Sequence, residues 1–320
     1  MPKPLRLALL GTGVAARQLY LPAFRRLGRR LEVVACASRG RSSAKEFARL
    51  AGIPKVAANA AELLALPEVE AVLVSLPIDA QPEHVLAALR AGKPVLSEKP
   101  VGPSVAAARG LLEQAARLPV PWLVAENYAF SPTFHRVLGW LEGGRLGALR
   151  VATARQILTM DADNPYFATA WRQAPRFVGG FVVDGGVHLA HWLRRCCGTP
   201  RNVRAVTAAF DPSKPPLDSA VAAIEFDSGV LASFTSCYSA RFSGPALELF
   251  GSEGVARLGL DEATLEPHRG RSLCYRTTRS TIDLELAHFA DVVRRGVKPA
   301  VTPADALADH ELVEAIVTAR

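Results

Sequence analysis

The stretch Leu5-Arg6-Leu7-Ala8-Leu9-Leu10-Gly11-Thr12-Gly13-Val14-Ala15-Ala16 decides the fold of the first part of the chain. Its first six residues predict a short buried strand, and the residues from Val14 onward have helical spacing. Gly11 permits a tight turn, Gly13 lets the backbone approach a pyrophosphate, and the small Ala16 allows the helix to pack closely on the strand. The start of such a helix offers free N–H groups to phosphates. This context predicts a dinucleotide-binding turn formed by Gly11, Thr12, Gly13, Val14 and Ala15.

Strand-like and helix-like segments alternate through the rest of the first third, in the rhythm of parallel βαβ units. The predicted strands are 31–37, 56–57, 71–76, 95–97 and 120–125, and the predicted helices are 14–27, 42–51, 60–66, 82–91 and 104–117. We therefore expect an N-terminal Rossmann domain over residues 1–125, with a doubly wound parallel sheet.

After residue 125 the pattern changes to longer segments with alternating apolar residues, which are typical of a large, mostly antiparallel open sheet. The predicted strands are 149–158, 203–210, 220–226, 230–239 and 246–250, and helices at 131–142, 186–197, 283–295 and 303–319 would cover one face. The sequence thus predicts a second α/β domain over residues 126–320, for substrate binding and oligomerisation. A length of 320 residues agrees with two domains.

The residues after the second strand bear on the choice of cofactor. NAD sites usually present an acid at this point, whereas NADP sites supply arginine for the 2′-phosphate. Here the position is Ser38, followed by Arg39 and Arg41. Two guanidinium groups without a carboxylate favour NADP(H) over NAD(H), although the same arginines could belong to an arginine-rich surface.

Composition excludes several classes of function. The net charge is +8, but the arginines are scattered and form no basic stripe interleaved with aromatic residues, which argues against nucleic-acid binding. No apolar run approaches the roughly 20 residues of a membrane span. The chain enters its first strand with no secretory leader, and its five cysteines show no CxxC spacing. We expect a cytoplasmic protein that binds neither nucleic acid nor membranes.

Two clusters of ionisable residues stand out, Glu98-Lys99-Pro100 and Asp184-Gly185-Gly186-Val187-His188. Of the 38 lysines and arginines only seven are lysine. In a chain so rich in arginine, an ordinary surface cation would normally be arginine, so a lysine at position 99 favours a specific role. The imidazole of His188 can exchange a proton near neutral pH, and Asp184, four residues earlier, would share its helix face. Judged on position alone, Lys99 could instead be a solvated surface lysine. His188 could likewise be a histidine of an amphipathic helix that contacts backbone or solvent.

These motifs resemble those of the family that contains glucose-fructose oxidoreductase, myo-inositol dehydrogenase and MocA. The resemblance rests on the glycine turn, Ser75-Leu76-Pro77 with His84, the block Ala91–Pro100 and the block Gly179–His188, in that order. It extends over essentially the whole chain. Trp171-Arg172 and the segment Phe250–Gly254 also look like family positions.

The resemblance implies a metal-free hydride transfer between nicotinamide and a carbinol or carbonyl carbon. It implies a cis Lys99–Pro100 bond, and a C-terminal sheet whose exposed face pairs subunits into a homodimer or homotetramer. The implied catalytic residues are Lys99, His188 and Asp184, with either Lys99 or His188 as the acid/base. Further cofactor-binding candidates are Ser75, Leu76, Pro77, His84, Glu98, Lys99, Asn127, Trp171 and Arg172, and the substrate-binding candidates are Lys99, Tyr128, Tyr166, Asp184 and His188.

Two positions depart from the pattern that the resemblance implies. His191 stands where relatives often have Asp, and Ala129 where they often have Arg, which bears on hydroxyl recognition and on the charge of the pocket. The leading hypothesis is an NADP(H)-dependent oxidoreductase acting on a sugar, cyclic polyol or related compound. The alternatives are an NAD-dependent inositol-type dehydrogenase and a non-catalytic dinucleotide-binding regulator of sugar metabolism. The presence of both Lys99 and His188 favours an enzyme.

Overall fold

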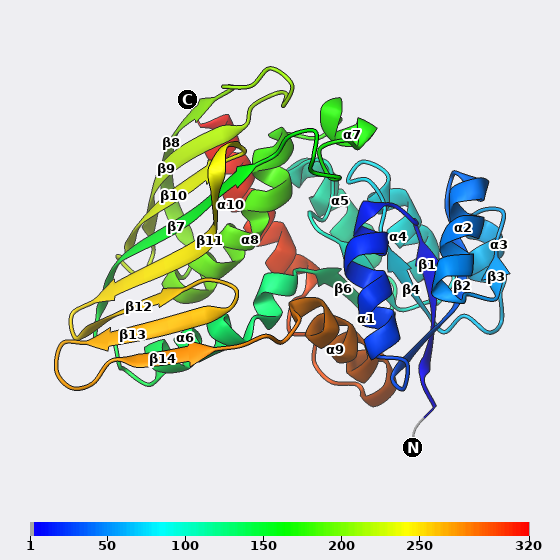
Figure 1. Ribbon diagram of the computed structural model, residues 1–320, viewed down its shortest axis with the longest axis horizontal. Helices are drawn as coiled ribbons and strands as arrows, with labels where there is room; N and C mark the ends of the chain where they lie inside the picture. The colour runs from blue at the N-terminus through cyan, green and yellow to red at the C-terminus, as the bar shows by residue number, and fades with distance from the viewer. Residues whose placement is uncertain (1–2, 320) are drawn as a thin grey trace. The chain divides into compact units, whose positions relative to one another are not determined.

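The computed structural model describes residues 3–319 (Figure 1). Contacts divide the chain into two compact units. Unit 1 comprises Met1–Glu126 and Ile282–Leu307, and unit 2 comprises Asn127–Thr281 and Ala308–Arg320.

Unit 1 is built on a six-stranded parallel sheet with the strand order β3-β2-β1-β4-β5-β6. The order reverses between β1 and β4, which makes the ends of these strands the switch point at which doubly wound sheets bind ligands. The predicted Rossmann sheet is confirmed. Its strands are β1 (Leu5–Leu10), β2 (Leu31–Ala37), β3 (Lys55–Val56), β4 (Ala71–Val74), β5 (Val95–Glu98) and β6 (Trp122–Ala125).

Short helices connect these strands, as the alternating pattern predicted. The first connection begins with a π-helical turn, η1 (Ala16–Tyr20), and continues as α1 (Leu21–Arg26). Ser104 caps its helix as expected for a short polar residue, accepting a bond from the Ala107 N–H at 3.2 Å. The other helices are α2 (Arg41–Ala51), α3 (Ala60–Ala65), α4 (Gln81–Arg90) and α5 (Val105–Ala115).

Helix α9 (Thr281–Arg295) packs in the core of unit 1, although it is far away in sequence. Its Leu286 and Phe289 are fully buried in the same cluster as Leu7 and Leu9 of β1. Salt bridges also tie this helix to unit 1, among them Arg26 to Asp283 at 2.6 Å. The expectation that the helix over residues 283–295 covers the sheet of the second domain was therefore wrong, because its apolar face packs in the core of unit 1.

Unit 2 is built on an eight-stranded sheet with the order β14-β13-β12-β11-β7-β10-β9-β8. All neighbouring strands are antiparallel except β7 and β10, so the predicted mostly antiparallel sheet is confirmed. Its strands are β7 (Leu149–Thr159), β8 (Pro200–Ala208), β9 (Ser219–Phe226), β10 (Leu231–Cys237), β11 (Ser239–Gly251), β12 (Gly254–Leu258), β13 (Glu262–Pro267) and β14 (Leu273–Arg276).

Helices α6 (Pro132–Glu142) and α8 (Gly180–Cys197) cover one face of this sheet (Figure 1). The core between them contains Trp192 of α8 and Phe234 of β10, both with 0% exposure. Shorter elements are η2 (Asn127–Phe130) and α7 (Ala170–Gln173), and α10 (Pro303–Thr318) begins in unit 1 and ends in unit 2. Within residues 3–319, no helix combines the length and hydropathy that a membrane span requires.

Helix α8 begins at Gly180, six residues before the predicted start at residue 186, so the predicted start was wrong. Glycine weakens helix interiors, so a helix that continues through Gly185-Gly186 is not indicated by propensity. In the structure these glycines lie inside the helix where sheet side chains approach it closely. A Cβ at Gly185 would lie 1.9 Å from the Tyr238 hydroxyl oxygen, and one at Gly186 would lie 3.1 Å from Phe234.

Candidate active site

The glycine turn lies between the ends of three neighbouring strands of unit 1. Gly11 has φ +99°, and its N–H donates to the Ala37 carbonyl at the end of β2. A Cβ on Gly11 would lie 2.0 Å from the Ser75 carbonyl oxygen, beyond the end of β4. No other residue fits at Gly11, so the turn is held tightly against the switch point of the sheet.

The same turn has features that fit a bound pyrophosphate. Gly13 is exposed, and a Cβ built on it would meet no atom within 4 Å, so the backbone is open to a close approach. Thr12 is 1% exposed, and its hydroxyl has no hydrogen-bond partner among residues 3–319, although buried polar groups are normally paired. The residues that the sequence predicted for the dinucleotide therefore form a cradle that fits phosphate groups.

Ser38, Arg39 and Arg41 lie where β2 leads into α2. Ser38 is half-buried, and both arginines are exposed. Gly40 has an extended conformation at the start of α2, and no side chain caps the first turn of this helix. The end of β2 thus presents positive charge and uncapped backbone N–H groups, which suits an anionic group.

The segment between β4 and α4 forms the next edge of the unit 1 site. Ser75, Leu76 and Pro77 are half-buried. The Nδ1 atom of His84 lies 2.9 Å from the Ala80 carbonyl oxygen, so its imidazole is fixed to the start of α4. Gln81, which directly follows Ala80, is 1% exposed, and neither its amide oxygen nor its amide nitrogen has a partner in the described part of the chain.

Glu98 and Lys99 lie at the carboxyl end of β5, and the Lys99–Pro100 bond is cis, as expected. The Tyr20 hydroxyl donates to Glu98 Oε1 at 2.7 Å. Glu126 and Glu285 are each 2% exposed. Burial, together with the charges of Glu98 and Glu126, raises the pKa of Glu285 well above its usual range.

In unit 2, helix α8 carries Asp184 and His188 one turn apart on one face. They are 7% and 8% exposed. Arg172 Nε donates to Asp184 Oδ2 at 2.7 Å, and the two side chains are 12% and 10% exposed. The carboxylate that the sequence placed beside His188 is therefore held by a buried guanidinium group.

An aromatic stack fixes the other side of His188. The Tyr128 ring lies on the imidazole with a centroid distance of 4.3 Å and an angle of 17°. Trp192 follows at 4.9 Å from Tyr128 and donates to the Tyr128 carbonyl at 3.2 Å. The neighbouring Asn127 donates its amide to the Thr281 hydroxyl at 2.7 Å. Stacking restricts the imidazole to one orientation.

Arg172 is itself enclosed by two predicted site residues. Its guanidinium carbon lies 3.9 Å from the Trp171 ring centroid and 5.1 Å from the Tyr166 ring centroid. Cation–π contacts of this kind stabilise a charge that is withdrawn from water. Trp171 and Arg172, predicted to bind cofactor, thus contact Tyr166 and Asp184, predicted to bind substrate.

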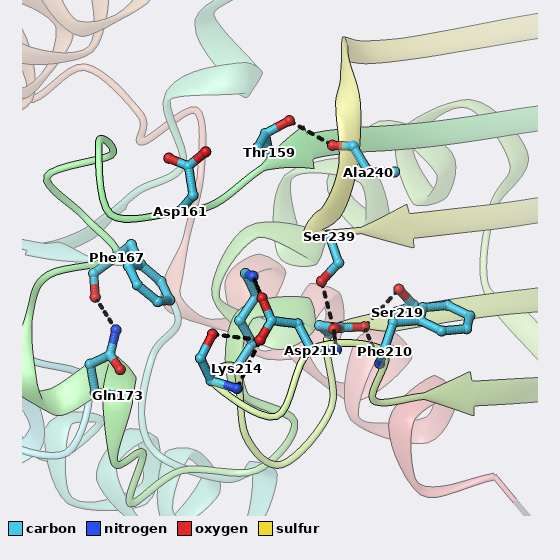
Figure 2. Close-up of polar contacts among 12 residues, drawn as sticks. Thr159, Asp161, Phe167, Gln173, Phe210, Asp211, Lys214, Ser219, Ser239 and Ala240 are labelled. Carbon is cyan, nitrogen blue, oxygen red and sulfur yellow. Dashed lines mark hydrogen bonds and ion pairs between the residues drawn. The ribbon is translucent and has the colours of Figure 1, made fainter.

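A polar network holds the segment that carries Tyr166 and Arg172 (Figure 2). The Gln173 amide donates to the Phe167 carbonyl at 2.7 Å, and the Lys214 ammonium lies 5.4 Å from the Phe167 ring centroid while paired with Asp211. Asp218 is fully buried. Burial raises its pKa, but the hydrogen bonds it accepts, first among them that from the Ser239 hydroxyl, outweigh burial and leave the pKa below its usual range.

His191, the departure noted in the sequence, contacts α10. Its Nδ1 atom lies 2.8 Å from Asp309 Oδ2, and Arg194 donates to the other oxygen of this carboxylate at 2.5 Å. His191 and Asp309 are both 1% exposed. The imidazole is therefore part of a buried polar contact between two helices of unit 2.

Sequence reasoning missed several residues that shape these two sites: Arg17, Tyr20, Glu126, Trp192, Lys214, Asp218, Tyr238 and Glu285. Most of them are far in sequence from the site residues that they contact, so no local sequence pattern reveals them. Arg17 is an exception, because it lies four residues after Gly13 and so one helical turn beyond the phosphate cradle.

Comparisons with known proteins agree with this architecture. Residues 5–126 match the family model for the oxidoreductase family with an NAD-binding Rossmann fold, and residues 134–257 match the GFO/IDH/MocA C-terminal domain. The chain belongs to the GFO/IDH/MocA family. It is an NAD(P)-dependent oxidoreductase, as its dehydrogenase and reductase relatives indicate.

Two curated relatives and one solved structure illustrate the similarity. Trans-1,2-dihydrobenzene-1,2-diol dehydrogenase of Bos taurus is 29% identical, over 88% of this chain and 85% of that protein. 1,5-Anhydro-D-fructose reductase of Ensifer adhaerens is 27% identical, over 94% and 91%. An oxidoreductase of Thermotoga maritima is 31% identical and superposes with a TM-score of 0.93, covering 99% of this chain and 96% of that one.

Proposed function

We propose that this oxidoreductase uses NADP(H) and acts on a carbinol or carbonyl carbon of a neutral cyclic polyol, sugar or related ring compound. The choice of NADP(H) rests on the end of β2, where Ser38 takes the place of an acid and Arg39 and Arg41 are exposed. A 2′-phosphate is held well by guanidinium groups, which form charge-assisted, bidentate hydrogen bonds. A free ribose hydroxyl would lack the carboxylate partner that NAD sites usually supply.

Each unit contains residues for which we propose a role in the reaction. The cradle Gly11–Ala15 would hold the pyrophosphate, with the Thr12 hydroxyl as a donor. Bound nicotinamide supplies or accepts the hydride. The Lys99 ammonium would polarise the substrate oxygen, and the His188 imidazole, oriented by Tyr128, would exchange the proton at that oxygen. Asp184, held by Arg172, would accept a hydrogen bond from a neighbouring substrate hydroxyl.

The charge balance of unit 2 supports a neutral substrate. Arg172 is paired with Asp184, and the buried Lys214 is paired with Asp211. A guanidinium group that is already neutralised gives little attraction to a substrate carboxylate or phosphate. The names of two relatives describe compounds of this kind, a cyclic diol and an anhydro sugar with a keto group.

Cofactor titration tests the first half of the proposal. NADPH and NADH would be titrated against intrinsic fluorescence in the wild type, in Arg39→Ala and in Arg49→Ala, which removes an exposed arginine from the other end of α2. We expect NADPH to bind at least tenfold more tightly than NADH, and Arg39→Ala alone to reduce this ratio. Equal affinities in the wild type would refute the assignment to NADP(H).

A substrate panel tests the second half. Neutral rings, such as 1,5-anhydrofructose and cyclic vicinal diols, would be compared with sugar acids, such as glucuronate, at equal concentration and with the preferred cofactor. We expect turnover of neutral rings to exceed that of sugar acids. A preference for the acids would show that the Arg172–Asp184 pair opens to bind a carboxylate, and the proposed substrate class would be wrong.

We also propose that the uncovered face of the unit 2 sheet pairs two copies of the chain. Val151 and Leu231 are 40% and 57% exposed and are direct neighbours in the β7–β10 register, and Phe250 of β11 pairs with Val151 from the other side. A continuous apolar row on a sheet face is typical of a subunit interface. Light scattering should give a dimer or tetramer for the wild type, and Leu231→Lys should shift it toward monomer.

The cytoplasm remains the proposed compartment. All five cysteines are free thiols. Burial raises the pKa of Cys36 to about 11 and that of Cys197 to about 12, so both stay protonated and unreactive at neutral pH. Free, buried thiols fit a reducing compartment, which cell fractionation would test.

A further inference from the structure

Arg17 joins the two segments of unit 1 that the proposed NADP(H) site would use. It belongs to η1, and its Nε atom donates to the Thr12 carbonyl of the glycine turn at 3.2 Å. Its Nη2 atom lies 3.3 Å from the Ser43 hydroxyl, 3.4 Å from the Ser43 carbonyl and 3.2 Å from Glu46 Oε2. Ser43 and Glu46 lie in the first two turns of α2, directly after Arg39 and Arg41. The guanidinium group thus spans from the phosphate cradle to the start of α2.

The present partners of Arg17 hold it weakly. All four hydrogen bonds are longer than the usual N–H···O distance of about 2.9–3.0 Å. The side chains of Arg17 and Glu46 are 30% and 57% exposed, and an ion pair in contact with water contributes little to stability. The hydrogen bonds of Arg17 within residues 3–319 use Nε and Nη2, so Nη1 keeps its donors for another acceptor.

A second observation at the same turn points to a site for a hydrogen-bonding ligand. The Thr12 hydroxyl is buried and has no partner among the residues that the structure describes, and the Thr12 carbonyl is the acceptor of Arg17 Nε. The adjacent Gly13 faces open space. The Phe47 ring, 5.8 Å from the guanidinium carbon, supports Arg17 from the side of the core. Arg17 is therefore pre-positioned next to a turn that lacks one of its hydrogen-bond partners.

We propose that Arg17 is a further specificity-determining residue for the 2′-phosphate of NADP(H), and that Glu46 is a built-in competitor which pairs with Arg17 until the phosphate replaces it. The inference rests on the proposed preference for NADP(H). A phosphate group carries close to two negative charges and three acceptor oxygens, so it is a stronger partner for guanidinium than one exposed carboxylate. NADH has no such group and would leave the Arg17–Glu46 pair intact.

The two partners of this pair should act in opposite directions. Arg17→Gln should weaken NADPH binding roughly tenfold, because it removes a charge-assisted hydrogen bond, and should change NADH binding less than about twofold. Glu46→Gln should strengthen NADPH binding roughly threefold, because it removes both the competitor and a like charge near the phosphate, and should not affect NADH. A gain in affinity cannot result from a folding defect, so Glu46→Gln keeps the test decisive even if Arg17→Gln fails to fold.

The experiment is calorimetric titration with NADPH, NADH and the fragments 2′,5′-ADP and 5′-AMP, which contain no nicotinamide and report on the adenosine end alone. Arg25→Gln is the matched control. Arg25 lies on the adjoining helix α1 and also joins α2, through a 3.0 Å hydrogen bond to the Leu50 carbonyl, but at the opposite end of α2. It should leave every affinity unchanged.

The outcomes separate this inference from the proposed function. If the wild type prefers NADPH and the preference falls in Arg17→Gln and rises in Glu46→Gln, both stand. If the wild type prefers NADPH but Arg17→Gln lowers the affinities for NADPH and NADH equally, Arg17 only fastens α2 to the turn and this inference is overturned alone. If the wild type binds NADPH and NADH equally, the cofactor proposal fails and this inference fails with it.

Discussion

The two units present their charged residues in opposite ways. In unit 2, Asp184 and Arg172 are about nine-tenths buried and bound to each other, and His188 is stacked on Tyr128. In unit 1, Arg39 and Arg41 are exposed, and the phosphate cradle is largely backbone. A site that binds an anion by its charge can remain open to water, whereas a site that must aim a hydroxyl and a proton has to fix its groups in advance.

The largest effect should come from Lys99, the residue of unit 1 that we propose takes part in the chemistry. Lys99→Met should lower kcat about 10²- to 10⁴-fold, because the charge on the reacting oxygen is then left without its donor. NADPH affinity should change little, since the phosphates are held elsewhere. Steady-state kinetics and fluorescence titration would measure the two quantities separately.

The control for this variant is Lys298→Met, which removes an exposed lysine of unit 1 beyond α9. It should retain full activity. An active Lys99→Met enzyme would show that proton transfer depends on His188 alone. All the residues needed for the chemistry would then belong to unit 2.

The next largest effect should be on stability, through Arg172. Arg172→Leu removes the guanidinium partner of the buried Asp184 carboxylate, which should lower the free energy of unfolding by about 3 kcal/mol. Adding Asp184→Asn to Arg172→Leu should restore most of this loss, because the amide carries no charge. Chemical denaturation would measure both.

Two arginine variants sharpen the contrast with Arg172. Arg39→Leu in unit 1 should weaken NADPH binding without lowering stability, because its side chain is exposed. Arg276→Leu breaks a pair whose side chains are 79% and 45% exposed, and should change stability by less than about 1 kcal/mol. Equal losses in Arg172→Leu and Arg276→Leu would contradict the view that burial makes the Arg172–Asp184 pair costly to break.

The difference between the two units also bears on how much of the structure could be predicted from the sequence. The six parallel strands and the glycine turn follow from short-range patterns, because Gly11, Gly13 and Ala16 come directly after the first apolar run. The strands β12, β13 and β14 were not predicted, since their segments are short and mix charged with apolar residues at the edge of the sheet. The start of α8 was misplaced because Gly185 serves the distant Tyr238.

Side-chain partners were the least predictable part of the sites. The sequence placed Asp184 near His188 by helical spacing, but gave no sign that Arg172 would bind it. Likewise, the amphipathic pattern over residues 283–295 correctly indicated a helix with a buried face, but its assignment to the second sheet was wrong, because that face packs in the core of unit 1. Glu285 lies on that face, and a carboxylate in a core position would ordinarily be expected to have a partner.

The smallest predicted effect concerns Glu285 and depends on pH. Burial and the charges of Glu98 and Glu126 raise its pKa in the folded state, whereas the unfolded chain has an ordinary glutamate. Below the ordinary pKa both states are protonated, and the group has no net effect. As pH rises above that value the unfolded state loses its proton and the folded state keeps it, so Glu285 lowers the stability of the wild type progressively.

Glu285→Gln should therefore stabilise the protein increasingly from about pH 5 upward, raising Tm by roughly 2–4 °C near pH 8 and by almost nothing at pH 4. Differential scanning fluorimetry across this range would measure it, with Glu113→Gln on the exposed side of α5 as the control. A gain that is constant with pH would mean that Glu285 is ionised in the folded protein. Unit 1 would then hold a compensated buried charge, as unit 2 does, and the difference between the two units would be reduced to their exposed arginines.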